Sequence, residues 1–156
     1  MTTTLREPLR ELANRCSLPA ALEAMGERWS FLILRGSFNG LCHFEEFQSE
    51  LGIARNILAN RLSRLVGHGI LERRAVAADR RKIEYRLTEK GRALLPTMVA
   101  LRQWGERWET GVAATPILVD ARDRRPIATV AVHSHDGRVL DKCDLLWAVE
   151  EDVVRD

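Results

Sequence analysis

Arginine and asparagine side chains recur on one face of a helix predicted over residues 54–67. The apolar residues Leu58, Leu62 and Leu65 lie at i, i+4 and i+7 and should point inward, which leaves the outward positions polar or small. Arginine can hydrogen-bond O6 and N7 of guanine together, and asparagine can do the same to N6 and N7 of adenine. The outward face is therefore suited to reading base edges in a DNA groove.

The expected DNA contacts lie on this helix and on a basic turn that follows it. Arg55, Asn56 and Asn60 are predicted at base edges, whereas Arg61 and Arg64 should reach phosphates. The basic turn should follow the backbone, with one arginine entering the minor groove. The alternative is a solvated helix face and a turn kept soluble by its charge. The full predicted set is Arg55, Asn56, Ala59, Asn60, Arg61, Ser63, Arg64, Arg80, Arg81 and Lys82.

Positive charge is concentrated in the same part of the chain. The net charge of the 156 residues is +2, but residues 54–92 hold 11 basic and 4 acidic side chains, a local charge of +7. Residues 112–156 carry 6 basic and 9 acidic side chains, a charge of −3. A basic patch of this kind is the electrostatic footprint expected for a partner with a phosphate backbone.

The elements that must position these residues follow from hydrophobic spacing and turn signals. Apolar residues at helical spacing predict helices over residues 18–25, 28–38 and 44–51 before the 54–67 helix, with Gly52 in the turn between the last two. Residues 70–76 and 83–87 are typical of two strands joined by the basic turn. Leu41 and Cys42 could add a very short strand beside them. A helix, a tight turn, a second helix and a hairpin together predict a winged helix-turn-helix.

The rest of the chain predicts a long helix and a β-rich tail. Thr88 is a good N-cap for a helix that should run to about residue 110. Three segments of the tail (residues 117–119, 127–132 and 139–149) are typical of short strands. The fold class is therefore α+β, mainly α, with a DNA-binding and dimerisation domain over residues 1–111 and a small β-rich C-terminal extension over residues 112–156.

An apolar stripe along the long helix is expected to form a dimer seam. Its residues recur at near-heptad spacing, and a small winged domain offers too little surface to cover them. The alternative is that the tail folds back over this helix. The predicted dimerisation residues are Leu94, Met98, Leu101, Trp104 and Trp108.

The three cysteines, Cys16, Cys42 and Cys143, are odd in number and widely spaced, so neither a disulfide framework nor a zinc cluster is expected. Cys42 is expected in the core. His133, His135 and Cys143 lack a fourth ligand, so no metal and no cofactor are predicted.

No catalytic motif is apparent, which argues against an enzyme. No apolar run long enough to cross a membrane is present, and the charged N-terminus does not resemble a signal peptide, so a cytoplasmic location is expected.

Several motifs at compatible spacing resemble the HxlR-type winged helix-turn-helix regulators. The resemblance covers roughly residues 16–108 and includes the run from Cys16 to Gly36 with its Arg28-Trp29 pair. The later motifs are Phe44-x-x-Phe47, Gly52-Ile53, Leu58-x-x-Arg61-Leu62-x-x-Leu65, Gly69-Ile70-Leu71-x-Arg73 and Tyr85-x-Leu87-Thr88-x-x-Gly91. Asp79-Arg80-Arg81 departs from this pattern and is more similar to the related MarR-type regulators.

The resemblance implies a dimeric transcription factor. A two-fold dimer would bind a pseudo-palindromic operator, and a response to a small molecule or to thiol oxidation is expected. Cys16 matches the position at which some HxlR-type members sense oxidants, although a small packing residue is the alternative there. A different class of function, a winged-helix protein–protein interaction module without specific DNA binding, stays open. The basic residues of the second helix and the turn favour DNA, because an interaction module would tend to be apolar there.

Overall fold

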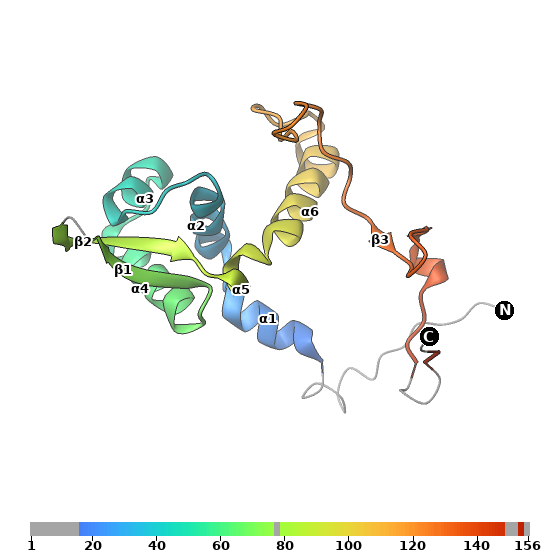
Figure 1. The fold of residues 1–156 in the computed structure, drawn as a ribbon, viewed down its shortest axis with the longest axis horizontal. Coiled ribbons are helices and arrows are strands. Elements are labelled where there is room, and N and C mark those ends of the chain that lie inside the picture. The colour runs from blue at the N-terminus through green and yellow to red at the C-terminus, as the bar shows by residue number, and fades with distance from the viewer. Residues whose placement is uncertain (1–15, 77–78, 149–152, 155–156) are drawn as a thin grey trace. The chain divides into compact units, whose positions relative to one another are not determined.

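The computed structural model describes residues 16–76, 79–148 and 153–154, and the side chains of Arg80 and Arg81 also lie outside this description. The chain forms two units: one spans Leu18–Ala113, and Ala114–Asp156 belongs to the other. The first unit contains the first four predicted helices and the predicted hairpin. It has a winged helix-turn-helix fold, which confirms the predicted fold class (Figure 1).

Four helices open the first unit: α1 (Ser17–Met25), α2 (Arg28–Phe38), α3 (Phe44–Leu51) and α4 (Arg55–Gly67). Helices α2, α3 and α4 pack around one apolar core. Its fully buried side chains include Ile33, Leu34 and Phe47 together with the predicted inward stripe Leu58, Leu62 and Leu65. Burying such side chains is the main driving force that holds the helices together.

A tight turn joins α3 to α4 at Gly52, whose φ of 60° lies in the left-handed region. Glycine adopts this conformation without steric cost, as the sequence predicts. The neighbouring Ile53 points into the core and is 2% exposed. The turn therefore fixes α4 against the core on one side and leaves its opposite side free.

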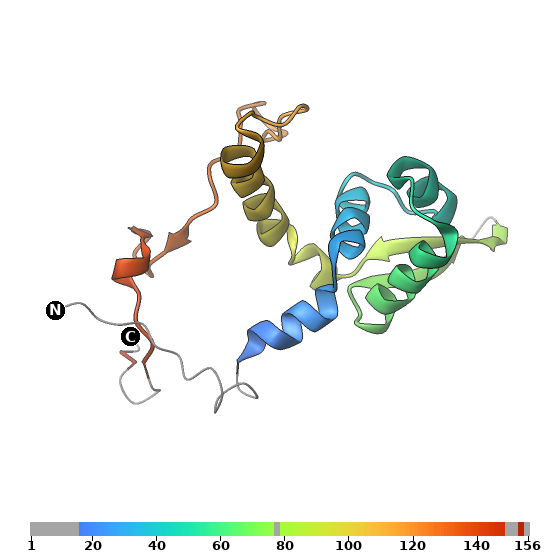
Figure 2. The same cartoon turned by 180° about the vertical axis from the view of Figure 1, so that it is seen from behind.

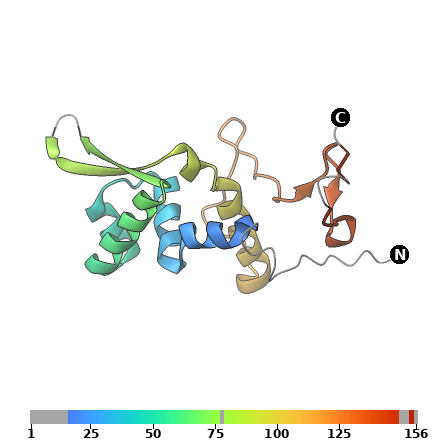
Figure 3. The same ribbon diagram turned by 90° about the horizontal axis from the view of Figure 1, so that it is seen from below.

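The wing is an antiparallel hairpin of β1 (Leu71–Val76) and β2 (Asp79–Leu87). Leu71 pairs with Leu87 at its base and Ala75 with Ile83 near its tip. Strand β2 begins at Asp79, so part of the predicted turn belongs to the strand. The chain before α3 adds a short pairing, because His43 bridges Glu84 as in an antiparallel strand. Figure 3 shows the hairpin lying across the helices.

The predicted single helix over residues 88–110 is wrong. The structure has α5 (Glu89–Arg92), α6 (Leu95–Gly105) and a π-helical turn, η1 (Glu106–Thr110). Thr88 caps α5 as predicted, because its hydroxyl accepts a hydrogen bond of 3.0 Å from the Gly91 N–H. Pro96 lies in the first turn of α6. Proline has no N–H and is tolerated in a first turn but not inside a helix, so a new helix starts here.

The C-terminal extension contains little regular structure in its described part. Strands β3 (Val132–His133) and β4 (Val139–Leu140) pair, followed by a 3-10 turn, η2 (Lys142–Asp144). An isolated bridge joins Val119 to Pro126. The strands are shorter than predicted, because apolar runs alone do not supply pairing partners. No helix in the described part of the chain is long and apolar enough to cross a bilayer.

Candidate nucleic-acid interface

One face of α4 is polar and exposed. The alternation with the buried stripe follows the helical period, so the face opposite the core carries the residues that the sequence predicts for DNA. Figure 2 shows α4 beside the wing hairpin. The exposed residues of this face are Arg55, Asn56, Ala59, Asn60, Ser63 and Arg64, and Arg61 is half-buried.

Arg55 occupies the first position of α4 and lies against an aromatic ring. Its guanidinium carbon is 4.8 Å from the centre of the Phe44 ring at the start of α3. A cation over a ring face is attracted by the negative charge of the ring, and contacts of this type restrict the side chain. Sequence reasoning missed Phe44 in this role. The contact orients the Arg55 guanidinium at the N-terminal end of α4. In helix-turn-helix proteins, this end of the recognition helix contacts base edges.

Arg61 and Arg64 form ion pairs within the domain. Arg61 pairs with Glu27, which precedes α2, and Arg64 pairs with Glu23 of α1 at 3.0 Å. Arg64 also donates to the Glu23 backbone carbonyl at 3.1 Å. These contacts attach α4 to the N-terminal helices, so both arginines have a positioning role in addition to any phosphate contact.

The wing presents basic side chains on its outer part. Lys82 on β2 is exposed, and Arg73 on β1 is exposed as well. The predicted contacts Arg80 and Arg81 lie in β2, but their side chains are outside the described residues. The backbone of β2 thus carries consecutive basic residues from position 80 to position 82.

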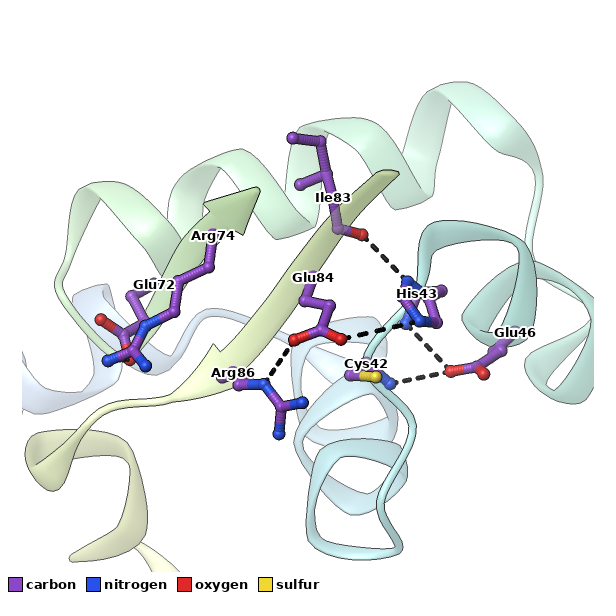
Figure 4. A network of polar contacts seen from close by, with 8 residues as sticks. All are labelled: Cys42, His43, Glu46, Glu72, Arg74, Ile83, Glu84 and Arg86. Atoms are coloured by element: carbon purple, nitrogen blue, oxygen red, sulfur yellow. Dashed lines mark hydrogen bonds and ion pairs between the residues drawn. The ribbon is translucent and has the colours of Figure 1, made fainter. Parts of the chain in front are cut away.

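A polar network joins the wing to the segment before α3 (Figure 4). Glu46 accepts hydrogen bonds of 2.9 Å from the backbone N–H groups of Cys42 and His43, which lowers the pKa of Glu46. His43 Nδ1 lies 3.1 Å from the Ile83 carbonyl oxygen. Glu84 is bonded to Arg86 at 2.6 Å, and this hydrogen bond lowers the pKa of Glu84.

Cys42 belongs to this network, so its predicted place in the core is wrong. The side chain is half-buried beside the carboxylates of Glu46 and Glu84. Burial raises the pKa of the Cys42 thiol, and the two negative carboxylates raise it further. The position of Glu46 three residues after the His43 N-cap is a capping-box signal that sequence reasoning could have used.

The predicted dimerisation residues divide into two groups. Leu94 and Met98 are half-buried and pack against the core of their own domain. Leu101, Trp104 and Trp108 are 50%, 52% and 64% exposed. Helices α1 and α6 both extend from the side of the domain away from the wing tip (Figures 1 and 2). None of the nine residues of α1, all of which the structure describes, is buried, although the helix is largely apolar.

Cys16 lies directly before α1 and is half-buried. It is a free thiol, as are Cys42 and Cys143. His133 is exposed and its Nδ1 lies 3.1 Å from the Gly137 carbonyl oxygen. Within the described residues, the group of potential metal ligands that comes together is Cys42, His43 and Glu84, and not the histidines of the extension.

Comparisons with known proteins relate this chain to a family of helix-turn-helix proteins. A model described as the HxlR-like helix-turn-helix matches residues 24–112. An uncharacterised HTH-type transcriptional regulator of Mycobacterium tuberculosis, Rv3095, is 43% identical over 101 residues, which make up 65% of this chain and 64% of that protein. The chain therefore matches just under two thirds of the length of this relative.

Solved structures show the same likeness. The crystal structure of PA1607, a candidate transcription factor, matches with a TM-score of 0.81 and 39% identity, over 88% of this chain and 96% of that one. The reduced form of the redox regulator HypR matches with a TM-score of 0.53 and 28% identity, over 59% of this chain and 92% of that one. The family model covers more than half of the chain, so this protein belongs to the HxlR-like helix-turn-helix family.

Proposed function

We propose that this protein is a transcriptional regulator that binds double-stranded DNA sequence-specifically as a homodimer on a pseudo-palindromic operator. The observation that carries the proposal is the exposed polar face of α4, which stands opposite the buried stripe and beside a basic wing. Family membership supports the same conclusion, because the relatives that match are named HTH-type transcriptional regulators.

In this proposal α4 enters the major groove and reads base edges through Arg55, Asn56 and Asn60. Ala59 and Ser63 complete the contact face. Arg61 and Arg64 hold α4 in position through Glu27 and Glu23. In the proposed complex they also contact phosphates. Arg80, Arg81 and Lys82 on the wing follow the backbone and contribute charge without sequence preference.

The proposed dimer forms through α1 and α6. Both helices expose large apolar side chains, among them Leu22 on α1 and Trp104 on α6. Large apolar side chains left exposed on neighbouring elements are typical of an interaction site. The second copy of this chain is the proposed partner, because a two-fold dimer places two α4 helices about one DNA turn apart. Leu94 and Met98 would complete the seam next to the core against which they pack.

Control by a thiol oxidant or a small molecule is the proposed form of regulation. Cys16 directly precedes α1, which belongs to the proposed dimer seam. Oxidation of its thiol would therefore alter the seam. The likeness to HypR, a redox regulator, supports this assignment. A protein with this role would work in the cytoplasm, where thiols are kept reduced until an oxidant appears.

Selection of genomic DNA fragments on the full-length protein tests the proposal. The protein is incubated with a fragment library, and bound fragments are sequenced after washes at two salt concentrations, with and without the thiol oxidant diamide. We expect enrichment of an inverted repeat with half-sites about 10 bp apart. We expect diamide to change this enrichment in the wild type and not in Cys16→Ser, while Cys143→Ser should behave as the wild type.

Binding without any enriched motif would contradict the proposal. It would favour the alternative function, a winged-helix module that binds other proteins and has no specific DNA binding. An enriched motif that diamide leaves unchanged would keep the DNA-binding function and reject Cys16 as its sensor.

A further inference from the structure

A thiol, an imidazole and a carboxylate meet where the wing touches the segment before α3. Cys42 Sγ, a ring nitrogen of His43 and a carboxylate oxygen of Glu84 all lie within 4.8 Å of one another. Cys42 and His43 precede α3, whereas Glu84 comes from β2, so the fold assembles the group from distant parts of the chain (Figure 4). All three residues are half-buried.

The hydrogen bonds around His43 prepare one ring nitrogen as a ligand. Nδ1 faces the Ile83 carbonyl oxygen at 3.1 Å, and a carbonyl oxygen can accept but not donate. In the neutral ring the proton therefore resides on Nδ1, and the lone pair resides on Nε2. Nε2 faces Glu84 Oε1 at 3.9 Å. This arrangement, with one ring nitrogen donating to a carbonyl and the other turned inward, is the usual support of a metal-bound histidine.

Backbone contacts hold the two segments together at this point. The Tyr85 N–H donates to the Cys42 carbonyl at 2.7 Å, directly beside Glu84. Glu46 accepts from the N–H groups of both Cys42 and His43. Arg86 engages Glu84 through Oε2, which leaves Oε1 directed at His43. The ligand atoms are thus oriented by a surrounding layer of hydrogen bonds.

We propose that Cys42, His43 and Glu84 bind one Zn²⁺ ion, with a water molecule as the fourth ligand. Sulfur, imidazole nitrogen and carboxylate oxygen are the donors that zinc takes in proteins, whereas magnesium and calcium prefer oxygen alone. With bonds of about 2.0–2.3 Å, the ligands of a tetrahedral zinc ion lie about 3.5 Å apart, so movements of about 1 Å close the set.

Binding breaks the Cys42 S–H bond, forms a Zn–S bond and releases one proton to the solvent. The ion then links β2 of the wing to the start of α3, across the junction that the Tyr85–Cys42 hydrogen bond already marks. Because the ion binds the folded chain, it stabilises that junction. This site does not depend on the proposed function, since none of its ligands belongs to the DNA-contact face.

Titration of the reduced, tag-free, full-length protein with Co²⁺ tests the site. Cobalt replaces zinc in such sites, and a thiolate ligand gives it a charge-transfer absorption band in the near ultraviolet. We expect this band to saturate at one Co²⁺ per chain and to disappear on addition of Zn²⁺. Cys42→Ser should abolish the band, and Glu84→Gln should weaken Co²⁺ affinity by more than about tenfold.

Matched controls use the other potential ligands of the chain. Cys143→Ser and His133→Ala should bind Co²⁺ as the wild type does, because neither residue belongs to the proposed ligand group. The absence of a thiolate band in the wild type, or an unchanged band in Cys42→Ser, would overturn the proposal.

A second measurement needs no variant and so does not depend on a variant's folding. Mass spectrometry follows the alkylation of each cysteine in the wild type with and without Zn²⁺. We expect Zn²⁺ to slow alkylation of Cys42 by more than about tenfold and to leave Cys143, which is exposed, unaffected. Equal rates at Cys42 in both conditions would likewise overturn the site.

Discussion

Arg55 combines an exposed position with a restrained side chain. It is the first residue of α4, and its guanidinium lies over the Phe44 ring. A side chain that is already ordered loses less conformational entropy when it hydrogen-bonds a base. In the proposed complex, Phe44 would therefore support DNA recognition indirectly, although its ring contacts the core on one side.

Replacing Arg55 by alanine should reduce specific DNA binding by about 1–3 kcal/mol and relax the preference at one base position. The reason is the loss of a bidentate contact to a base edge. Fluorescence anisotropy on the selected operator and on random DNA measures both effects. Arg35→Ala, which removes an exposed arginine from α2, should bind as the wild type does. An equal loss on operator and random DNA would count against base reading by Arg55.

Lys82 should act through charge alone. It is exposed on β2 beside Arg80 and Arg81, and a lysine on a phosphate releases condensed counterions. We expect Lys82→Ala to weaken binding to all sequences alike and to lower the slope of log affinity against log salt by about one unit. A salt titration of operator binding measures the slope. A change in base preference without a change in slope would contradict this role.

At the scale of the elements, α5 is fitted closely against the base of the wing. The Ile70 carbonyl before β1 accepts a hydrogen bond of 3.1 Å from the Thr88 N–H, and the Thr88 hydroxyl donates at 2.6 Å to the neighbouring Gly69 carbonyl. Gly91 of α5 packs on the Ile70 carbonyl, where an added Cβ would overlap the oxygen. The junction therefore requires glycine because of space.

Gly91→Ala should lower the free energy of unfolding by at least about 2 kcal/mol, since the overlapping carbonyl is held by its hydrogen bond and cannot move aside. Urea denaturation followed by circular dichroism measures the change. Gly67→Ala is the matched control, because a Cβ there meets nothing within 4 Å. Its stability should stay unchanged or rise by less than about 1 kcal/mol. Equal stability of the Gly91→Ala variant and the wild type would show that the junction can relax.

At the scale of the whole molecule, the apolar surface of α1 and α6 has too few partners within its own domain. Trp104 and Trp108 remain exposed while Leu94 and Met98 of the same stripe are covered. The first residues of the stripe therefore pack against the core, and its last residues lie on the surface. This division is what a helix needs if it leaves the domain to meet a second copy.

Trp104→Glu should dissociate the proposed dimer into monomers of 17.7 kDa. A carboxylate buried at the seam would have no partner. A tryptophan at the centre of an interface often contributes about 2 kcal/mol or more to binding. Light scattering after gel filtration measures the mass. Trp147→Glu in the extension, also at an exposed tryptophan, should remain dimeric. Dissociation by Trp147→Glu with a dimeric Trp104→Glu would place the interface in the extension instead.

Local patterns in the sequence predicted the helices and strands that bear the candidate site. The buried stripe of α4, the left-handed turn at Gly52 and the Thr88 cap each depend on residues within a few positions. The helix over residues 88–110 was predicted as continuous because its apolar spacing continues past Pro96. That spacing carries no information about the close approach of Gly91 to Ile70.

The class of the fold, the family and the exposed polar face of α4 could be predicted from the sequence, because side-chain period and turn chemistry are local properties. The partners of Arg55, Arg61 and Arg64 depend on how distant segments pack, and so does the position of Cys42 beside Glu84 instead of in the core. These contacts join residues up to 42 positions apart. Their formation depends on how α1, α3 and the wing pack, and packing depends on the fit of all elements together rather than on any one segment.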